Sequence, residues 1–306
     1  MVSVIIVTLN AKEGLRLCLD SVMEQTYAPG EVIVINNAEN AIPEDRFSGR
    51  KIPVRLFNAQ GNLFYCQALN QGIRMASGEF VLCLNDDVTL EPGFIEEGLK
   101  GFYKHPKIGM VSGKLMRSDK KTIDSTGLFA SAWRTAKERG YGVRDRGQFA
   151  KEGYIFGVNG AAAFYRRKML EDVRENEDYF DPVYRIFYED LDISWRAQRR
   201  GWKGYYLPRA AAYHVRGATV RKKEGIDKPF ARAFLNDELH IDLIKNRYLT
   251  IIRNESIAGF ILHLPFILIY ELLSWGYILI FNPRLFNKFL PKVSGLKSAF
   301  NKRTPS

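Results

Sequence analysis

Cysteine is scarce in this sequence. Three cysteines occur among 306 residues, at Cys18, Cys66 and Cys83, widely spaced and in apolar surroundings. Neither metal-ligand spacing nor a disulfide framework is visible among them. We therefore expect three reduced thiols in the core of a cytosolic protein.

The amino terminus lacks the features of a secretory signal. A short apolar stretch, Val4 to Val7, gives way to Thr8, and no basic segment precedes it. A signal peptide has a basic start and a longer apolar core. We interpret the stretch as a first β-strand. Internal repeats and low-complexity tracts are also absent.

The chain has few acids for its number of bases, with a formal net charge of +11. A charge of this size suits a nucleic-acid-binding protein, which would show steeply salt-dependent binding. Its distribution favours a membrane surface instead. Residues 282–306 carry six Lys or Arg and no acid, directly after the most apolar segment, 257–281. Basic residues beside an apolar stretch suit the cytoplasmic face of a membrane. We expect no nucleic acid partner.

The apolar segment 257–281 is long enough to cross a bilayer. As a helix its 25 residues extend about 37 Å, against a hydrocarbon core of about 30 Å. It nevertheless contains His263, Pro265 and Glu271. A carboxylate near the middle costs about 3 kcal/mol even on a lenient insertion scale. We expect a peripheral or monotopic helix, with a true span and a buried soluble helix as the alternatives.

Apolar runs alternate with helical patterns in the first part of the chain. Strands are predicted at 2–7, 32–35, 54–57 and 80–84, and helices at 15–23, 69–76 and from Pro92 onward. This alternation predicts an α/β fold with a mixed, mainly parallel sheet and helices on both faces.

The periodicity weakens between about 113 and 153, where we expect loops. It returns with an apolar run at 160–165 and an acidic helix from Glu189 to Arg200, which Gly201 ends. Two short strands, at 205–207 and 210–215, are predicted after it.

Two acidic clusters stand out. Asn85-Asp86-Asp87 follows the buried strand at 80–84, and Glu189-Asp190-Leu191-Asp192 begins the acidic helix. The first cluster is expected at the carboxyl edge of the sheet, where open α/β folds bind ligands and a divalent ion could bridge a diphosphate. The alternative for the first cluster is an ordinary turn. The second suggests a general base, or acids that only complement a helix dipole.

Five segments carry a resemblance to a known family. The sequence is similar to family 2 glycosyltransferases of the GT-A (Rossmann-like) fold over roughly residues 2–220, through Val4–Asn10, Gln25–Tyr27, Val32–Ala38, Leu84–Val88 and Phe187–Arg196. Within that family it resembles the rhamnosyltransferase-like branch, through Asp124–Gly127, Gly157–Ala161, Tyr165–Arg167, Phe180-Asp181 and Pro208–His214.

The resemblance implies a metal-dependent inverting transfer in cell-surface glycan synthesis. The expected donor is a dTDP- or UDP-linked sugar, with dTDP-rhamnose favoured. The expected acceptor is a polyprenyl-diphosphate-linked glycan or a polysaccharide. It also implies a nucleotide-sugar-binding half at 1–112, an acceptor-binding and catalytic half at 113–225, and a helical membrane-association region with a basic tail at 226–306.

The nucleotide-sugar site is expected, from the resemblance, at Thr8, Asn10, Asn36, Asn62, Asp86 and Asp87. Asn10 also suits a helix cap that pairs with Glu13. The family usually has Asp where this chain has Asn36. An amide can still accept from a pyrimidine N3–H and donate to a carbonyl, so base contact is retained in principle.

A divalent ion, Mn2+ or Mg2+, is expected on Asp87, with Asn85 as a weak or water-mediated contributor. The resemblance also assigns His214 to this ion, whereas an isolated histidine is more often structural.

The expected catalytic base is Asp190, because a carboxylate in the first turn of a helix is stabilised as the anion that accepts a proton. Glu189 is expected to orient it or to bind acceptor hydroxyls. Asp192 and Trp195 are assigned to the acceptor side of the cleft, with a core role for Trp195 as the alternative.

The chain lacks the Gln-x-x-Arg-Trp signature of processive synthases, having Gln198-Arg199-Arg200-Gly201-Trp202 instead. Transfer of one or very few sugars is therefore expected. Because Asn36 and Asn85 replace acids, a catalytically degenerate nucleotide-sugar-binding scaffold at the membrane is the alternative. A homo-oligomer stays open.

Overall fold

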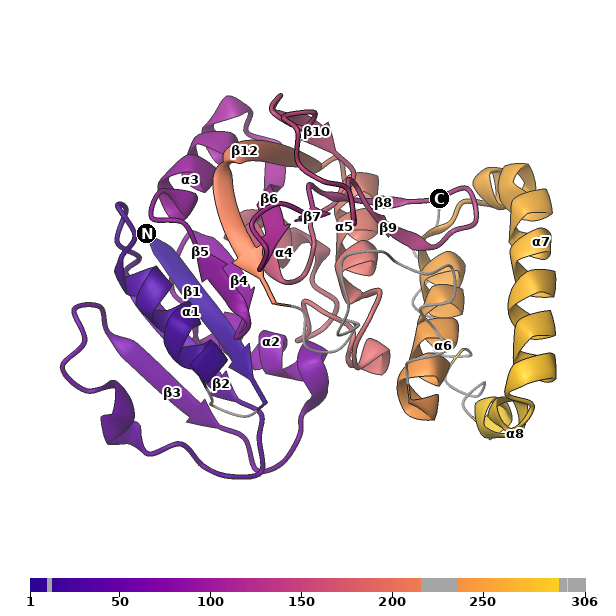
Figure 1. Cartoon of the computed structure of the whole chain (residues 1–306), viewed down its shortest axis with the longest axis horizontal. Coiled ribbons are helices and arrows are strands. Elements are labelled where there is room, and N and C mark those ends of the chain that lie inside the picture. The colour runs from indigo at the N-terminus through magenta and orange to yellow at the C-terminus, as the bar shows by residue number, and fades with distance from the viewer. Residues whose placement is uncertain (10–12, 216–235, 292–295, 297–306) are drawn as a thin grey trace.

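The computed structural model of the chain describes residues 1–9, 13–215, 236–291 and 296 (Figure 1). The strands are β1 Val2–Thr8, β2 Glu31–Asn36, β3 Val54–Asn58, β4 Phe80–Asn85, β5 Val88–Leu90, β6 Ile108–Arg117, β7 Ile123–Ser125, β8 Leu128–Ala130, β9 Ala136–Glu138, β10 Gly153–Ile155, β11 Ala162–Arg166 and β12 Lys203–His214. The α-helices are α1 Glu13–Met23, α2 Phe64–Met75, α3 Phe94–Lys104, α4 Arg167–Val173, α5 Glu189–Arg199, α6 Asp237–Asn254, α7 Ile257–Phe281 and α8 Arg284–Phe289, and the 3-10 helices are η1 Glu44–Phe47 and η2 Pro182–Tyr184.

One twisted sheet organises the chain, with the strand order β10-β12-β6-β11-β4-β1-β2-β3. β1 runs parallel to β2 and β4, β2 to β3, and β12 to β6, while β11 is antiparallel to β4 and β6. The predicted mixed, mainly parallel sheet is therefore confirmed. Val7 is in register with Asn85, and Thr8 with Asn36, so β1, β2 and β4 end together at one edge.

The first strands form where the sequence is apolar on both faces. Every residue of β1 and β2 is buried. Along β1, Val4 and Ile6 pack into one core cluster and Ile5 into the other, because side chains alternate across a strand. All three cysteines are buried free thiols, as expected.

Residues 113–153 are rich in loops, as expected. They also contain the strands β7, β8 and β9, which at three residues each are too short for a periodic pattern, and β8 pairs with β9 as a separate hairpin. The prediction of two strands at 205–207 and 210–215 is wrong, because these residues form one strand, β12. Its register shifts between Leu207 and Ala211, where Pro208 interrupts the ladder.

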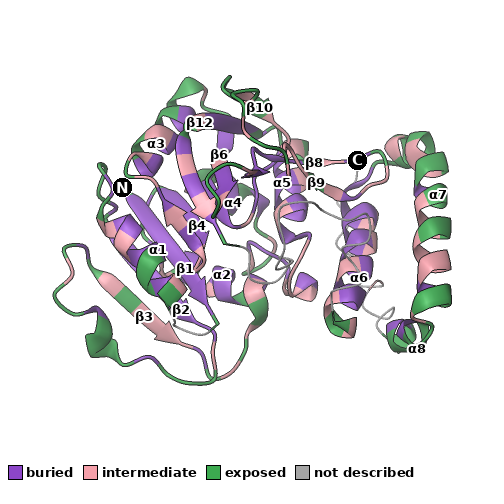
Figure 2. Ribbon diagram, in the orientation of Figure 1, coloured by how far each residue is buried: buried purple, intermediate pink, exposed green. Residues whose placement is uncertain are grey.

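The C-terminal helices lie beside α5 and the β8–β9 hairpin (Figure 1). α6 packs against α5, while α7 lies outside α6 and presents a largely exposed face (Figure 2). The boundary expected at residues 225 and 226 lies outside the described residues. α6 buries polar residues such as Asn246 and Asn254, so it is part of the packing of the sheet domain.

Candidate active site

A cavity of about 500 Å³ opens at the edge where β1 and β4 end. Both acidic clusters reach it, because the start of α5 faces this edge. Its lining comes from the ends of β1, β4 and β12, the β8–β9 hairpin, the segments before β11 and α5, the start of α5, and one residue each of α2 and α6. The lining residues are Val7, Leu9, Tyr65, Asn85, Asp86, Asp87, Leu128, Ala136, Glu138, Asn159, Gly160, Ala161, Ile186, Phe187, Tyr188, Glu189, Asp190, His214 and Leu243.

Thr8 and Asp86 join the ends of β1 and β4. The Thr8 hydroxyl donates to Asp86 Oδ2 at 2.5 Å. Burial raises the pKa of Asp86, against the lowering effect of this hydrogen bond, and the charge of Asp87 raises it further. Gly14 at the start of α1 is needed because a Cβ there would lie 2.9 Å from the Asp86 carbonyl oxygen. The helix therefore approaches the acidic cluster closely.

His214 lies between two carboxylates at the end of β12. Its Nε2 is 3.2 Å from Asp87 Oδ1, and its Nδ1 is 2.9 Å from Oδ2 of the fully buried Asp124. Burial alone would lower the pKa of His214, but the hydrogen bonds and charges of Asp124 and Asp87 raise it to about 9. Asp124 therefore fixes the ring so that Nε2 faces Asp87.

The residues around Asp87 fit a divalent cation. Two ligands at right angles, each about 2.1 Å from an ion, lie about 3 Å apart, close to the separation of Asp87 Oδ1 and His214 Nε2. Asn85 Oδ1 is buried without a hydrogen-bond partner among the described residues. Across this same part of the chain, no group of three or more His, Cys, Asp or Glu could hold a metal. The chain thus offers a partial shell that a ligand would complete.

The acid pair begins α5, as predicted. Asp190 Oδ2 accepts from the Gly160 amide at 3.2 Å, and Oδ1 accepts from the Leu191 amide at 2.7 Å. Donors of this kind stabilise a carboxylate in its ionised form. Glu189 is buried, with Oε2 lacking a partner in the described structure. Burial and then the charge of Asp190 raise the pKa of Glu189 to about 8.

The two adjacent carboxyl groups therefore have different environments. Burial favours the protonated form of Glu189, whereas Asp190 is held by backbone amides. Different environments of this kind allow one carboxyl group to accept a proton while its neighbour donates a hydrogen bond.

Glu138 of β9 is a cavity residue that the sequence analysis missed. Its Oε1 accepts from Asn159 Nδ2 at 2.5 Å, and Oε2 accepts from the Ser125 hydroxyl. The signal was partly present, since Ser125 and Asn159 belong to two of the motifs that carried the branch resemblance. Glu138 itself lay in the stretch expected to be loop.

The predicted base-contacting residue, Asn36, does not line the cavity. It is fully buried, and its amide donates to the Asn40 carbonyl and to Asn58 Oδ1, both at 2.8 Å. With both amide hydrogens engaged, Asn36 fixes the loop after β2, and its contact with the base stays a prediction. One of its two acceptors, Asn58, lies on the neighbouring strand β3.

Asn62 has a similar internal role, because its Oδ1 accepts from Asn37 Nδ2 at 3.0 Å and from the Phe64 amide at 2.8 Å. It does not line the cavity. The predicted nucleotide-binding residue Asn10 lies outside the described residues.

The two predicted acceptor-side residues, Asp192 and Trp195, do not line the cavity. Asp192 is 1% exposed and faces the interior, accepting from Arg196 Nε at 2.9 Å and from Asn254 Nδ2 at 2.8 Å. Trp195 packs its ring edge-on against Phe156, with centroids 5.8 Å apart. Asp192 points away from Asp190 because residues two apart on a helix are rotated by about 200°. Trp195 is three residues from Asp192 and therefore lies near it on the packed face of α5.

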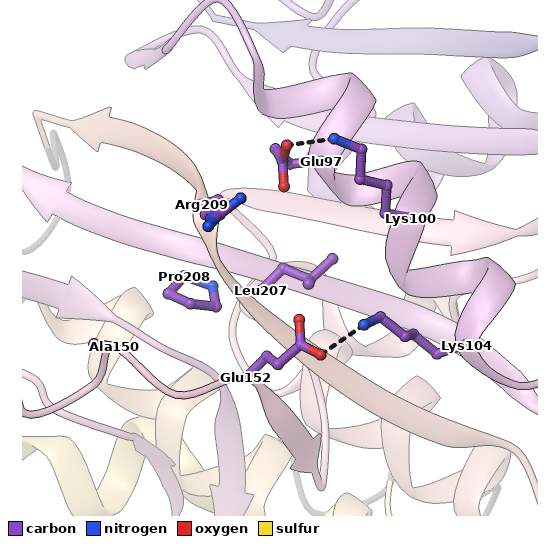
Figure 3. Close-up of a pocket in the computed structure, with 8 residues that line it drawn as sticks. All are labelled: Glu97, Lys100, Lys104, Ala150, Glu152, Leu207, Pro208 and Arg209. Carbon is purple, nitrogen blue, oxygen red and sulfur yellow. Dashed lines mark hydrogen bonds and ion pairs between the residues drawn. The ribbon is translucent and has the colours of Figure 1, made fainter.

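A second hollow, of about 410 Å³, lies between α3 and β12 (Figure 3). Lys100 Nζ is 2.6 Å from Glu97, and Lys104 Nζ is 2.7 Å from Glu152 (Figure 3). These exposed pairs neutralise one another, and neither acidic cluster reaches this hollow. The cavity at the sheet edge is therefore the candidate active site.

Curated proteins with related sequences include a polysaccharide synthase and a glycosyltransferase by name. The chain is 25% identical over 224 residues to the poly-beta-1,6-N-acetyl-D-glucosamine synthase of Staphylococcus epidermidis, covering 72% of this chain and 51% of that protein. It is 31% identical over 99 residues to the uncharacterized glycosyltransferase YwdF of Bacillus subtilis, covering 32% of this chain and 37% of that protein. The chain thus spans about half the length, or less, of these relatives.

Solved structures share the architecture. Staphylococcus aureus TarS 1-349 in complex with UDP-GlcNAc matches with a TM-score of 0.61 at 15% identity, over 98% of this chain and 81% of that chain. GalNAc-T7 with UDP, GalNAc and Mn2+ matches with a TM-score of 0.58 at 15% identity, over 82% and 48%. At these identities the likeness establishes the fold, which is GT-A.

The family model of Glycosyl transferase family 2 matches residues 3–174, more than half of the chain. That range contains β1 to β4 and the first acidic cluster. Glu189 and Asp190 follow it in the same cavity. The chain belongs to glycosyl transferase family 2.

Proposed function

We propose that the protein is an inverting glycosyltransferase that uses Asp190 as its general base. One observation carries the proposal: the acids after β4 and the acids at the start of α5 line the same cavity. An acceptor hydroxyl beside Asp190 would give up its proton to the carboxylate while its oxygen bonds to the anomeric carbon. The bond from that carbon to the nucleoside diphosphate breaks in the same step, and the diphosphate leaves with the electron pair.

Asp87, His214 and Asn85 would hold a divalent ion, Mn2+ or Mg2+, whose chemistry is to neutralise the leaving diphosphate. Asp124 supports this assignment, because it keeps Nε2 of His214 directed at Asp87. Neutral Glu189 would donate a hydrogen bond to an acceptor hydroxyl or to the sugar, which leaves Asp190 as the proton acceptor.

The donor we favour is dTDP-rhamnose, on the strength of the branch motifs in the sequence. UDP-GlcNAc is the second candidate, since a matching solved structure holds UDP-GlcNAc and a curated relative is a poly-N-acetylglucosamine synthase by name. Asn36 is occupied internally, so base selection would fall to other groups at this edge.

We infer that the acceptor is a polyprenyl-diphosphate-linked glycan or a polysaccharide, met at the cytoplasmic face of a membrane. Among the described residues, α7 is the one helix long and apolar enough to cross a bilayer. The mean hydropathy of its most apolar 18-residue stretch is 1.9, and 11% of that stretch is buried. Its exposed side chains include Leu262, Leu272, Leu273 and Ile280. Such an apolar face would sit in the lipid interface.

A thermal-shift panel of dTDP, UDP, GDP and their sugars, each with and without Mn2+, tests the donor assignment. A ligand at about 100 times its Kd adds about 2.7 kcal/mol of stability. A metal-dependent shift with dTDP-rhamnose, followed by turnover with a lipid-linked acceptor, supports the proposal. A shift with UDP-GlcNAc alone selects the second donor. A nucleotide-induced shift without any sugar turnover favours the scaffold alternative, and no shift with any nucleotide, in a folded sample, overturns the donor-site assignment.

A further inference from the structure

The segment just before the acid pair has an unusual backbone. Arg185 has φ +59° and ψ −65°, and the Ile186 amide donates to the Tyr184 carbonyl at 2.6 Å, which together form a tight γ-turn. Phe187 and Tyr188 then have φ values of +70° and +69°. Positive φ is costly for residues that carry a Cβ, so segment 184–188 needs outside contacts to hold this shape.

Asn246, on α6, supplies three of those contacts. Its Nδ2 lies 2.6 Å from the carbonyl oxygen of Tyr184, 2.7 Å from that of Ile186 and 2.9 Å from that of Phe187. The two amide hydrogens are therefore shared among three of the five carbonyls in the segment.

The Tyr184 carbonyl also accepts from the Ile186 amide in the γ-turn, and the other two carbonyls have backbone donors as well. The Arg185 carbonyl accepts from the Tyr65 amide at 3.0 Å, and the Tyr188 carbonyl accepts from the Asp192 amide at 2.8 Å. Removing the Asn246 side chain would take away its hydrogen bonds to the Tyr184, Ile186 and Phe187 carbonyls. Water has little access there to replace them, because Asn246 is fully buried.

The orientation of Asn246 is fixed by the same carbonyls. A flipped amide would direct its oxygen at three other oxygens, so Nδ2 must face the segment. Its Oδ1 is buried without a hydrogen-bond partner in the described part of the chain. The bonds from Nδ2 are therefore made at the expense of one unsatisfied buried oxygen.

The segment that Asn246 holds is part of the active-site wall. Ile186, Phe187 and Tyr188 line the cavity next to Glu189 and Asp190. Tyr188 is also the N-cap residue, immediately before the first residue of α5. A change in the backbone here would redirect the first turn of α5 and with it both carboxyl groups.

We propose that Asn246 is a positioning residue for the transfer reaction, holding segment 184–188 in the strained form that presents Glu189 and Asp190 to the cavity. The effect of Asn246 on catalysis rests on the proposed function. Its role in holding segment 184–188 rests on the hydrogen bonds alone. α6 is thereby a working part of the transferase domain, although it comes from the region expected to serve membrane association.

Asn254 provides a matched control. It is also a buried asparagine on α6, but its Nδ2 donates to Asp192 Oδ1 at 2.8 Å and to the Thr250 carbonyl at 3.2 Å. Asn246→Ala and Asn254→Ala each remove one buried amide from the same helix. Only the first removes donors from segment 184–188.

The experiment compares hydrogen–deuterium exchange of the full chain and its two variants in peptides covering 184–190. We expect Asn246→Ala to exchange about tenfold faster there or more, with Asn254→Ala close to wild type in these peptides. Equal protection of 184–190 in both variants would overturn the proposal. If Asn246→Ala does not fold, Asn246→Ser, which keeps one donor, takes its place.

Steady-state kinetics, with the donor identified by the nucleotide panel, test the effect of Asn246 on catalysis. Asn246→Ala should lose kcat by about tenfold or more while the nucleotide-induced thermal shift persists, because the base is displaced and the donor groups are not. Equal kcat losses in the two variants would contradict a positioning role. If the wild-type chain transfers no sugar at all, the proposed function fails, and the exchange comparison alone decides the role of Asn246.

Discussion

Glu271, the one carboxylate in the apolar helix α7, forms an ion pair with Arg247 of α6. Arg247 also donates to the Trp133 carbonyl at the tip of the β8–β9 hairpin. Near the start of α7, Arg134 of the same hairpin lies 2.9 Å from His263. The polar groups of α7 thus face the sheet domain along its length. A spanning α7 would carry Arg134 and Arg247 into hydrocarbon, so this arrangement favours a helix lying in the interface.

Membrane binding should depend on the outward face of α7. Leu272 is 76% exposed there. Leu272→Glu should strongly reduce co-flotation with anionic vesicles without lowering the melting temperature, because a charge is placed in lipid but not in the protein core. Leu17→Glu, at an exposed leucine of α1, is the control and should float like wild type. Unchanged flotation of the Leu272 variant would contradict the interfacial arrangement.

Asp190→Asn should lower kcat by about 10²–10⁴-fold while nucleotide binding persists, since general-base catalysis contributes in that range. Steady-state kinetics and the nucleotide thermal shift measure the two effects. Asp192→Asn is the neighbouring control. Its carboxylate pairs with Arg196 in the interior, so it should lose stability while the folded protein keeps most of its kcat. Full activity of Asp190→Asn would exclude this residue as the base.

Metal dependence should follow Asp87. Asp87→Asn, or addition of EDTA to the wild type, should remove the part of the nucleotide-induced thermal shift that Mn2+ contributes. Asp45→Asn, on the exposed surface of η1, should retain it. A Mn2+ effect of wild-type size in the Asp87 variant would locate the ion elsewhere.

The buried Glu189 should make stability depend on pH. Its pKa is raised in the folded chain to about 8 from an ordinary 4.5, so between these values the folded state holds a proton that the unfolded state has lost. Stability therefore falls as pH rises through this window. The titratable groups around Glu189 are Asp190 and Asp192 on α5, Tyr65 and Cys66 on α2, and Tyr165 on β11.

Glu189→Gln removes that titration. By urea unfolding, the variant should match wild type near pH 4 and exceed it near pH 8.5 by on the order of 3 kcal/mol, because one pKa unit corresponds to about 1.36 kcal/mol. The exposed Glu24→Gln should give no such divergence. Parallel pH profiles for Glu189→Gln and wild type would show that Glu189 is ionised in the fold.

The early strands were predictable because their information is local. β1, β2 and β4 are apolar on both faces, and the acids after β4 reach the sheet edge simply by following it. β7 to β9 were not predictable, since three-residue strands carry no period. The single strand β12 was read as two because Pro208 marks a bulge in place of a chain reversal.

The sequence alone determined the family, the mainly parallel sheet and the positions of both acidic clusters, because strand composition and motif order are written along the chain. The tertiary structure decided which polar side chains serve the cavity. Asp190 faces it, and Asp192 is buried against Arg196. The Asn36 amide donates to Asn58, and Asn246 of α6 donates to segment 184–188. Such roles depend on partners brought together by packing, and those contacts exist only once the chain has folded.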